Sequence, residues 1–317
     1  MKPAVIMNPR AGGGAAGRRW PAIHAELERR VGSAEVRITR SAGHGAALAR
    51  ALAAEGFDPI IAAGGDGTLS EVANGILATT GGAHLGVLPL ASGGDFARTL
   101  GLATIAQALD ALATGETRAA DVVRVQFHGA SGQSSTRYFI NAASIGLGAL
   151  AAQGVRGWKR VLPARTRYLA AAAPALAQQR AFAIRLRLDG GPAIESNAAT
   201  LILANGRYIG AGLLVAPTAE IADGLMEVVL VERLGLVEVA ANVGLLYSGA
   251  IDSHPKVRHW RARTVEVDGG PAPAELDGDP AGTLPLEAEV LAGAIRILCP
   301  AGFRSTPSAA YRGAKRV

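Results

Sequence analysis

The sequence has one cysteine among its 317 residues, Cys299, and no long uncharged run of purely apolar residues. One cysteine excludes a disulfide framework within the chain and fits a reducing compartment. The longest uncharged stretches contain several glycines and polar residues, so they predict no membrane-spanning helix. No secretory signal is visible, because a short apolar run follows Met1 almost directly. We therefore expect a cytoplasmic protein, with peripheral contact to the inner membrane face left open.

Charged residues are also few. They make up 18% of the chain and hydrophobic residues 49%, which is the opposite of the composition of a disordered chain. The net charge of +6 is modest and does not indicate a nucleic-acid partner. It suits an anionic partner such as a phosphate or an acidic membrane surface. The chain length predicts two domains.

The first and second parts of the chain differ in their pattern of predicted strands and helices. Strand and helix signals alternate at first, which predicts a doubly wound, mostly parallel sheet in residues 1–123. Short alternating runs separated by Gly, Pro and Asp turns then predict a β-rich, sandwich-like domain over 124–300, interrupted by helical stretches at 168–178 and 237–247. The tail 301–317 is either a loose terminus or a segment that completes the first domain. The predicted fold class is therefore α/β with a β-rich second domain.

The strongest local signal is the run Gly64-Gly65-Asp66-Gly67-Thr68, between a buried strand and the start of a helix. Free N–H groups and the positive end of the helix dipole favour a phosphate there, and glycines let the backbone approach it. An aspartate among phosphates is repulsive unless a cation or a ribose hydroxyl lies between them. Asp66 therefore predicts a contact with Mg²⁺ or a sugar. The alternative is a tight turn with a polar cap and no ligand.

Two more glycine-bearing loops follow strands. The run 12–17 formally matches the dinucleotide fingerprint, and Arg40 after the next strand would suit a 2′-phosphate, which keeps an NADP-dependent oxidoreductase open. Against it, residues 8–11 stand where the fingerprint needs a glycine directly after the strand. The run 89–98 follows a third strand. Three such loops at the carboxyl edge of one sheet predict a ligand site. The chain has no Gly-Lys dipeptide, which excludes a Walker A loop.

These three loops resemble the nucleotide-binding segments of the bacterial diacylglycerol kinase-like lipid kinases. That family is related to sphingosine and ceramide kinases and, more distantly, to NAD kinases. The similarity continues downstream in the same order, at Tyr138-Phe139-Ile140-Asn141, Asn205-Gly206, Pro217, Asp223-Gly224-Leu225 and Asp277-Gly278-Asp279. The Asn-Glu pair typical of NAD kinases is absent from the sequence. The resemblance implies an ATP- and Mg²⁺-dependent kinase that phosphorylates the hydroxyl of a diacylglycerol-like lipid at a membrane surface.

The resemblance also implies roles for individual residues. The implied nucleotide-binding residues are Asn8, Pro9, Arg10, Ala11, Gly12, Thr39, Gly64, Gly65, Asp66, Gly67, Thr68, Leu69, Ser70, Ser92 and Asp95. The family's structural Mg²⁺ implies the Asp223 side chain, with backbone carbonyls of Glu220 and Leu225. Asp277 and Asp279 are implied to provide the proton acceptor. A carboxylate suits that role, since a lipid hydroxyl keeps its proton far above neutral pH. Without the resemblance, the same residues predict only a β-turn.

Three positions depart from the family pattern. Ser70 replaces the asparagine that usually precedes Glu71, and Gly94 replaces the asparagine that usually precedes Asp95. Asp279 is one methylene shorter than the usual glutamate. A displacement of about 1 Å in a catalytic group can cost ~100-fold in rate. A catalytically impaired homologue that still binds nucleotide or lipid therefore stays open.

A weaker signal concerns the membrane. The run Gly157-Trp158-Lys159-Arg160 is followed by Arg165, Arg167 and Tyr168. Aromatic and basic side chains together suit docking on an anionic bilayer. Such clusters are more often a solvated face, so the sequence alone leaves this contact undecided.

Overall fold

The computed structural model describes residues 2–91, 93–128, 134–150 and 181–303. The chain divides into two compact units. Unit 1 comprises Met1–Ala120 and Gly293–Ser305, and unit 2 includes Asp121–Ala292. The segment that returns to unit 1 thus begins at Gly293, within the last strand, whereas the sequence suggested a return from residue 301.

Unit 1 contains a parallel sheet. Its strands lie in the order β2 (Glu35–Ile38), β1 (Ala4–Met7), β3 (Ile60–Gly64), β4 (Leu85–Pro89) and the end of β17 (Leu286–Leu298). Each of these neighbouring pairs is parallel, including the last, in which Ile297 is opposite Leu85. Every residue of β1 and most of β3 and β4 are buried, as expected for strands covered on both faces.

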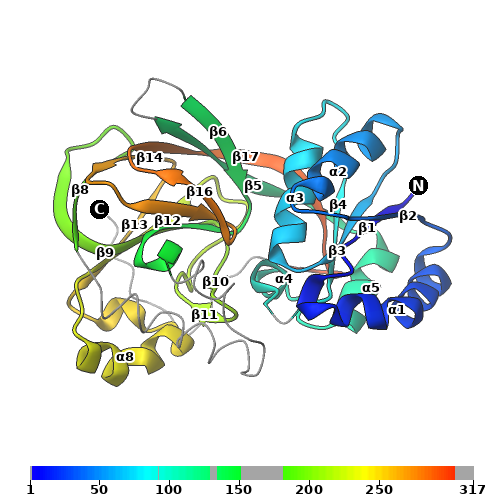
Figure 1. The fold of residues 1–317 in the computed structure, drawn as a ribbon, viewed down its shortest axis with the longest axis horizontal. Helices are drawn as coiled ribbons and strands as arrows, with labels where there is room; N and C mark the ends of the chain where they lie inside the picture. The colour runs from blue at the N-terminus through cyan, green and yellow to red at the C-terminus, as the bar shows by residue number, and fades with distance from the viewer. Residues whose placement is uncertain (1, 92, 129–133, 151–180, 304–317) are drawn as a thin grey trace. The chain divides into compact units, whose positions relative to one another are not determined.

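Helices cover both faces of this sheet (Figure 1). One layer contains α1 (Ala15–Val31) and α5 (Ile105–Thr114), which contact each other, and the other contains α2 (His44–Ala54) and α3 (Asp66–Leu77). The helices are amphipathic; α1, for example, buries Ile23 and Leu27 and leaves its charged residues outside. This arrangement confirms the predicted doubly wound sheet.

Unit 2 is built from antiparallel strands. They are β5 (Thr117–His128, from Asp121 on), β6 (Ser134–Phe139), β7 (Ala142–Gly146), β8 (Phe182–Leu188), β9 (Ile194–Ala204), β12 (Met226–Glu232), β13 (Val257–Ala262), β14 (Thr264–Gly269), β15 (Pro273–Leu276), β16 (Asp279–Thr283) and most of β17. The short hairpin β10 (Tyr208–Ile209) and β11 (Leu213–Leu214) and the helix α8 (Leu236–Ser248) complete it. The β-rich second domain is confirmed, and α8 coincides with the helix predicted at 237–247.

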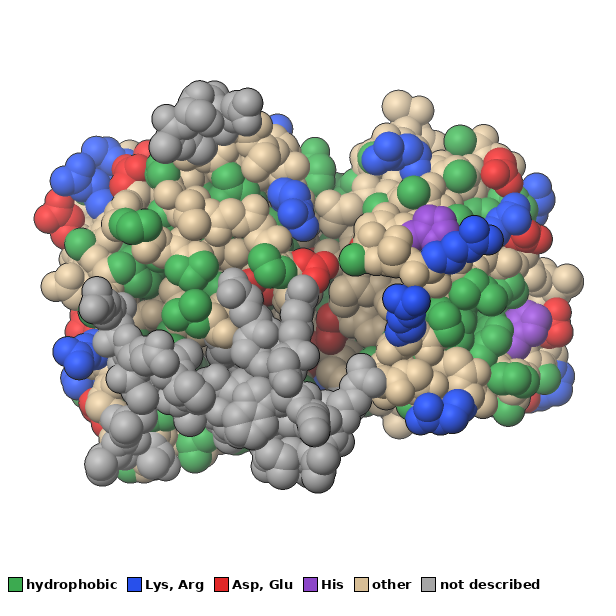
Figure 2. Space-filling view, viewed as in Figure 1, with side chains coloured by type: hydrophobic (Ala, Val, Ile, Leu, Met, Phe, Trp, Pro, Cys, Tyr) green, Lys and Arg blue, Asp and Glu red, His purple; other side chains and the backbone are tan. Residues whose placement is uncertain are grey.

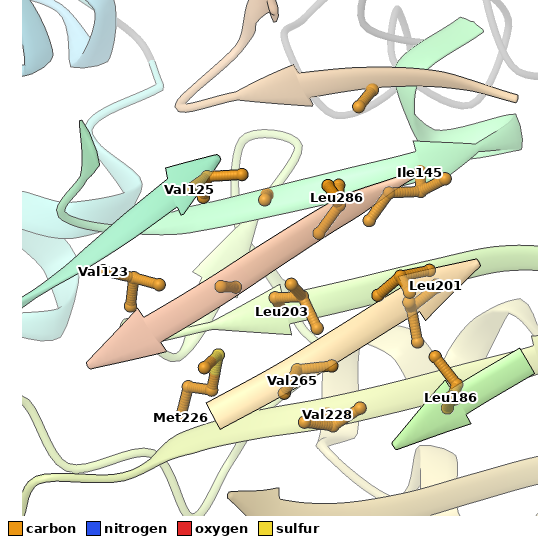
Figure 3. Close-up of a cluster of buried hydrophobic side chains, with 14 of the residues drawn as sticks. Val123, Val125, Ile145, Leu186, Leu201, Leu203, Met226, Val228, Val265 and Leu286 are labelled. Carbon is orange, nitrogen blue, oxygen red and sulfur yellow. The ribbon is translucent and has the colours of Figure 1, made fainter. Parts of the chain in front are cut away.

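Alternating side chains of these strands form the core of unit 2. Figure 3 shows its members meeting from β5, β7, β8, β9, β12, β14 and β17, among them Val123, Leu203, Val228 and Leu286. Such residues are almost fully buried, so their burial supplies the main stabilisation of the unit.

The order β16-β15-β7-β9 within the sheet determines where the polar residues of unit 2 lie. Glu275 of β15 is opposite Ser144 of β7, and Ser144 is opposite Ile202 of β9. Their neighbours Ala143 and Leu276 belong to the core cluster. Because side chains alternate along a strand, Glu275, Ser144 and Ile202 share the other face of the sheet.

No helix in the described part of the chain is both long and apolar enough to cross a membrane. On the visible face, basic and acidic side chains are interspersed (Figure 2). The residues proposed for bilayer docking, 157–168, lie outside the described residues, as do the helical stretch 168–178 and the tail from 304.

Candidate functional site

The loops after β1, β3 and β4 meet at one edge of the unit 1 sheet. Asn8 Nδ2 donates to Thr68 Oγ1 (3.0 Å), and the N–H of Leu90 donates to the carbonyl of Gly64 (2.7 Å). Asn8 Oδ1 also accepts from the N–H of Arg10 (3.0 Å), which fixes the turn that follows β1. The three glycine loops predicted from the sequence therefore form one connected surface.

Two glycines permit this close approach. Gly12 has φ +57°, and a Cβ there would lie 3.2 Å from the carbonyl oxygen of Leu90. A Cβ on Gly93 would lie 2.7 Å from Asp66 Oδ2. A side chain at either position would therefore push neighbouring loops apart.

The Asp66 carboxylate points toward the third loop. Its Oδ2 accepts from the N–H of Gly94 (2.9 Å), at the start of α4 (Asp95–Thr99). Burial raises the pKa of Asp66, and the amides of Gly94, Phe96 and Asp95 oppose that rise. The carboxylate thus links the second and third loops through Oδ2, while its Oδ1 is buried without a hydrogen-bond partner among the described residues. The predicted contact of Asp66 with Mg²⁺ or a sugar stays a prediction.

The other predicted nucleotide-binding residues divide by exposure. Those with surface available to a ligand are Pro9, Arg10, Ala11, Gly12, Gly65 and Gly67. Those that are buried are Thr39, Gly64, Thr68, Leu69, Ser70 and Asp95. Helix α3 has Gly65 as its N-cap and no side-chain cap, so N–H groups of its first turn are candidate donors to an anion. Ser92 lies outside the described residues.

Glu71 is a supporting residue to which the sequence gave no role. Its carboxylate accepts from the N–H groups of Gly43 and Gly45, each at 2.8 Å, at the start of α2. It therefore anchors the segment that follows Thr39. The two partners are 28 and 26 residues away in the chain, a distance at which local sequence patterns give no signal.

In unit 2, Asp277 is held by backbone donors. Its Oδ1 accepts from Asn141 (3.0 Å) and Ala142 (3.1 Å), and its Oδ2 accepts from Ile140 (3.1 Å). The residue is 8% exposed and has φ +49°, which fixes a turn between β15 and β16. With both oxygens committed to the backbone, Asp277 orients this turn.

Asn205 belongs to the same structure. Its Nδ2 donates to the carbonyls of Ile140 (2.8 Å) and Asp121 (2.9 Å), while its N–H donates to Asn141 (2.8 Å). Three motifs quoted for the resemblance, around residues 138–141, 205–206 and 277–279, are therefore in contact within unit 2.

Asp279 and Glu275 complete a group of three carboxylates with Asp277. Asp279 begins β16 and is partly exposed, whereas Glu275 is 7% exposed and accepts from the N–H of Gly278. Burial raises the pKa of Glu275 to about 7, the Ser144 hydroxyl and Gly278 N–H oppose the rise, and the charges of Asp277 and Asp279 add to it. The sequence did not single out Glu275, because its burial depends on pairing between β15 and β7.

An apolar cavity of about 160 Å³ lies in unit 2. Its lining includes Ile202, Leu213, Val215, Leu245, Leu246 and Val257. Ile202 is opposite Ser144, which is opposite Glu275, so the cavity and Glu275 are about two strand spacings apart, or roughly 10 Å. The apolar cavity and the Glu275 carboxylate thus share one face of this sheet.

The turn predicted to bind structural Mg²⁺ has a basic partner. The Asp223 carboxylate is paired with the Arg261 guanidinium, whose Nε also lies 3.2 Å from Glu227 Oε1. Asp223 Oδ1 accepts from the N–H of Leu225 (3.0 Å). Arg261 therefore supplies positive charge beside this turn. A metal on the Asp223 side chain and the backbone carbonyls of Glu220 and Leu225 stays a prediction.

Further ion pairs connect Glu227 to His259 and His259 to Asp252. His259 lies 2.7 Å from Glu227 and 2.8 Å from Asp252. Burial lowers the pKa of His259, but the carboxylates of Asp252 and Glu227 outweigh this and raise it to about 9. Acidic and basic groups therefore alternate from Asp223 to Asp252.

Comparison with known proteins gives two family matches that follow the two units. Residues 2–125 match the diacylglycerol kinase catalytic domain, and residues 141–299 match the YegS C-terminal NAD kinase beta sandwich-like domain. A diacylglycerol kinase of Mycobacterium tuberculosis is 30% identical over 305 residues, covering 94% of this chain and 95% of the relative. One from Staphylococcus saprophyticus is 28% identical over 283 residues, covering 89% and 90%.

Solved structures agree on the fold. A diacylglycerol kinase from Bacillus anthracis superposes with a TM-score of 0.72 at 21% identity, covering 95% of this chain and 97% of the other. An NAD kinase from Archaeoglobus fulgidus in complex with ATP gives 0.50 at 14% identity, covering 95% and 94%. These sequence matches favour a kinase over the NADP-dependent oxidoreductase that the sequence analysis left open. With both units matched along nearly their whole length, the chain belongs to the diacylglycerol kinase family.

Proposed function

We propose that this member of the family transfers the γ-phosphate of ATP, in the presence of Mg²⁺, to the hydroxyl of a diacylglycerol-like lipid. The observation that carries the proposal is the turn at Asp277–Asp279, which lies beside Glu275, a residue that shares a sheet face with an apolar cavity. In this account unit 1 binds the nucleotide, and unit 2 binds the lipid and supplies the proton acceptor.

The glycine loops suit the phosphates of ATP. The first N–H groups of α3 and the exposed backbone of Gly12 provide donors at the edge of the sheet. Arg10 is exposed beside them and adds positive charge. Mg²⁺ accompanying the nucleotide would neutralise charge on the phosphates. No residue of the chain is assigned to hold it.

The carboxylates suit the chemistry at the lipid. As the lipid oxygen forms its bond to the γ-phosphorus, the bond from that phosphorus to the bridging oxygen breaks and ADP leaves. The hydroxyl proton passes to a carboxylate, for which Asp279 is the candidate, because it is partly exposed. Asp277 orients the turn through its three backbone donors.

The apolar cavity suits part of a lipid tail. Its volume of about 160 Å³ and its aliphatic lining fit a segment of an acyl chain. A lipid substrate also requires the protein to act at a membrane surface, which we propose is the cytoplasmic one, reached by peripheral contact.

The test is transfer of labelled γ-phosphate from ATP to hydroxyl lipids in mixed micelles. The panel contains a diacylglycerol, a sphingoid base, phosphatidylglycerol and a polyprenol. We expect Mg²⁺-dependent labelling of the diacylglycerol, its loss in Asp279→Asn, and its retention in Glu266→Gln, which removes an exposed acid of β14. ATP binding without transfer to any lipid would instead favour the catalytically impaired homologue.

A further inference from the structure

We propose that Glu275 is a positioning residue whose ionised carboxylate holds the Asp277–Asp279 turn and makes phosphoryl transfer depend on pH near neutrality. The inference rests on the proposed function, because it concerns the proton acceptor of that reaction. It adds to the two aspartates a third acid, which does not itself touch the substrate.

Glu275 lies in the hairpin formed by β15 and β16, close to its turn. It is the second-last residue of β15, directly opposite Ser144 of β7, and is 7% exposed. Its carboxylate accepts the N–H of Gly278, the residue between the two aspartates. Asp277 and Gly278 both have positive φ, +49° and +88°, so the turn is tight, and Glu275 satisfies the N–H of Gly278. Glu275 therefore stabilises the turn by accepting the hydrogen bond from Gly278.

Neighbouring groups act on the charge of Glu275. Asp277 on the turn and Asp279 on β16 act on it as like charges, while the Ser144 hydroxyl from β7 and the Gly278 N–H stabilise its charge. Burial has the largest effect, and together these raise the pKa of Glu275 to about 7.

Ionisation of Glu275 then has two consequences. A charged acceptor makes a stronger hydrogen bond to Gly278 than a neutral one, which keeps Asp279 in place. A further negative charge in the turn also increases its attraction for the proton that leaves the lipid hydroxyl. Both effects weaken when Glu275 takes up a proton, so transfer should rise as the pH increases through about 7.

The first test is the pH profile of kcat/KM for the wild type, Glu275→Gln and Glu275→Asp. Glutamine keeps an acceptor for Gly278 but never carries charge. We expect the rising limb near pH 7 to be lost in Glu275→Gln, with kcat at pH 8 lowered about 10-fold, since a misplaced group costs rate steeply. Aspartate restores the charge and should restore the limb in part. Glu266→Gln is the matched control and should keep the wild-type profile.

The second test needs no activity. An acid whose pKa is raised on folding binds its proton more tightly in the folded state, so it reduces stability as the pH rises from about 4.5 to about 7. We expect the Tm of Glu275→Gln, relative to the wild type, to increase between pH 5 and pH 8. The same difference for Glu266→Gln should stay flat.

Two results would overturn the inference. One is a Glu275→Gln enzyme that keeps the limb near pH 7, which would assign that limb to the nucleotide or another group. The other is a Tm difference that does not change with pH. Absence of transfer by the wild type at every pH would instead refute the proposed function, and the Tm series would still decide whether Glu275 ionises in this range.

Discussion

The candidate sites of unit 1 and unit 2 consist of different chemical groups. In unit 1 the surface offered to a ligand is mainly backbone, while the polar side chains of Asn8, Asp66 and Glu71 bind one loop to another. In unit 2 the site consists of side-chain carboxylates, of which Asp277 is held by the backbone N–H groups of residues 140–142. We therefore expect changes in unit 1 to act through loop shape, and changes in unit 2 to act through charge.

The largest effect should come from Asp279→Asn. Removing the proton acceptor should lower kcat by about 10²–10⁴, the usual range for a general base. Because Asp279 is partly exposed at the start of β16, stability should change by less than about 1 kcal/mol. Single-turnover kinetics at saturating ATP measures the first quantity and chemical denaturation the second.

Asp277→Asn sharpens this comparison inside unit 2. Asparagine has one acceptor oxygen, so part of the set of N–H groups that now bind Asp277 would face an amide nitrogen. We expect a loss of about 2–4 kcal/mol in the free energy of unfolding. A variant with wild-type stability and the same rate loss as Asp279→Asn would contradict the division of roles.

Arg261→Met comes next. It leaves the Asp223 carboxylate without its cation and removes one of the two basic partners of the Glu227 carboxylate, which is 2% exposed and keeps His259. We expect a loss of about 2–3 kcal/mol in the free energy of unfolding, somewhat below the figure for a fully buried pair because Arg261 keeps some exposure. The matched control is Arg185→Met, which breaks an exposed pair with Glu195 and should cost at most about 1 kcal/mol.

A comparison of Tm with and without Mg²⁺ tests whether a structural metal binds at Asp223. Without nucleotide, the Tm of the wild type should be the same in EDTA and in millimolar Mg²⁺. A Tm that rises with Mg²⁺ in the wild type would show that Asp223 binds a cation in place of Arg261.

Gly93→Ala tests the shape argument for unit 1. The added Cβ would meet Asp66 Oδ2 at 2.7 Å and displace the third loop. We expect the Kd for ATP to increase about 10-fold, which corresponds to about 1.4 kcal/mol. Gly81→Ala is the control, because the nearest atom to its Cβ would be at 3.8 Å. Equal ATP affinity in the two variants would refute the argument.

The smallest effect should come from Gly94→Asn, which restores the asparagine usual in the family. Gly94 has φ +63°, and a Cβ there would meet its nearest neighbour at 3.7 Å, so asparagine fits both the space and the conformation. Stability should stay within about 0.5 kcal/mol. If the wild type is a working kinase, turnover should change little. A large gain in turnover would favour the impaired homologue.

The sequence predicted those parts of the molecule whose signals are local. The apolar strands β1, β3 and β4, the helix α8 and the glycine loops are each readable within a short window. The loops could be assigned to one edge because parallel strands end together.

Other features depend on contacts between distant residues. Asp66 meets Gly94 28 residues away, and Arg261 meets Asp223 38 residues away. Asp66 and Asp223 therefore have partners that no local sequence pattern indicates. Glu275 is hidden from sequence reasoning for the same reason, since an alternating strand predicts its face but not what covers that face.

The most direct test of the account is transfer of labelled phosphate from ATP to a diacylglycerol in mixed micelles, measured together with ATP binding for the wild type and Asp279→Asn. The account predicts Mg²⁺-dependent product with the wild type, loss of product in the variant, and equal ATP binding by both. Product formed equally well by Asp279→Asn would contradict the assignment of the proton acceptor in unit 2. Failure of the wild type to bind ATP would contradict the account of unit 1.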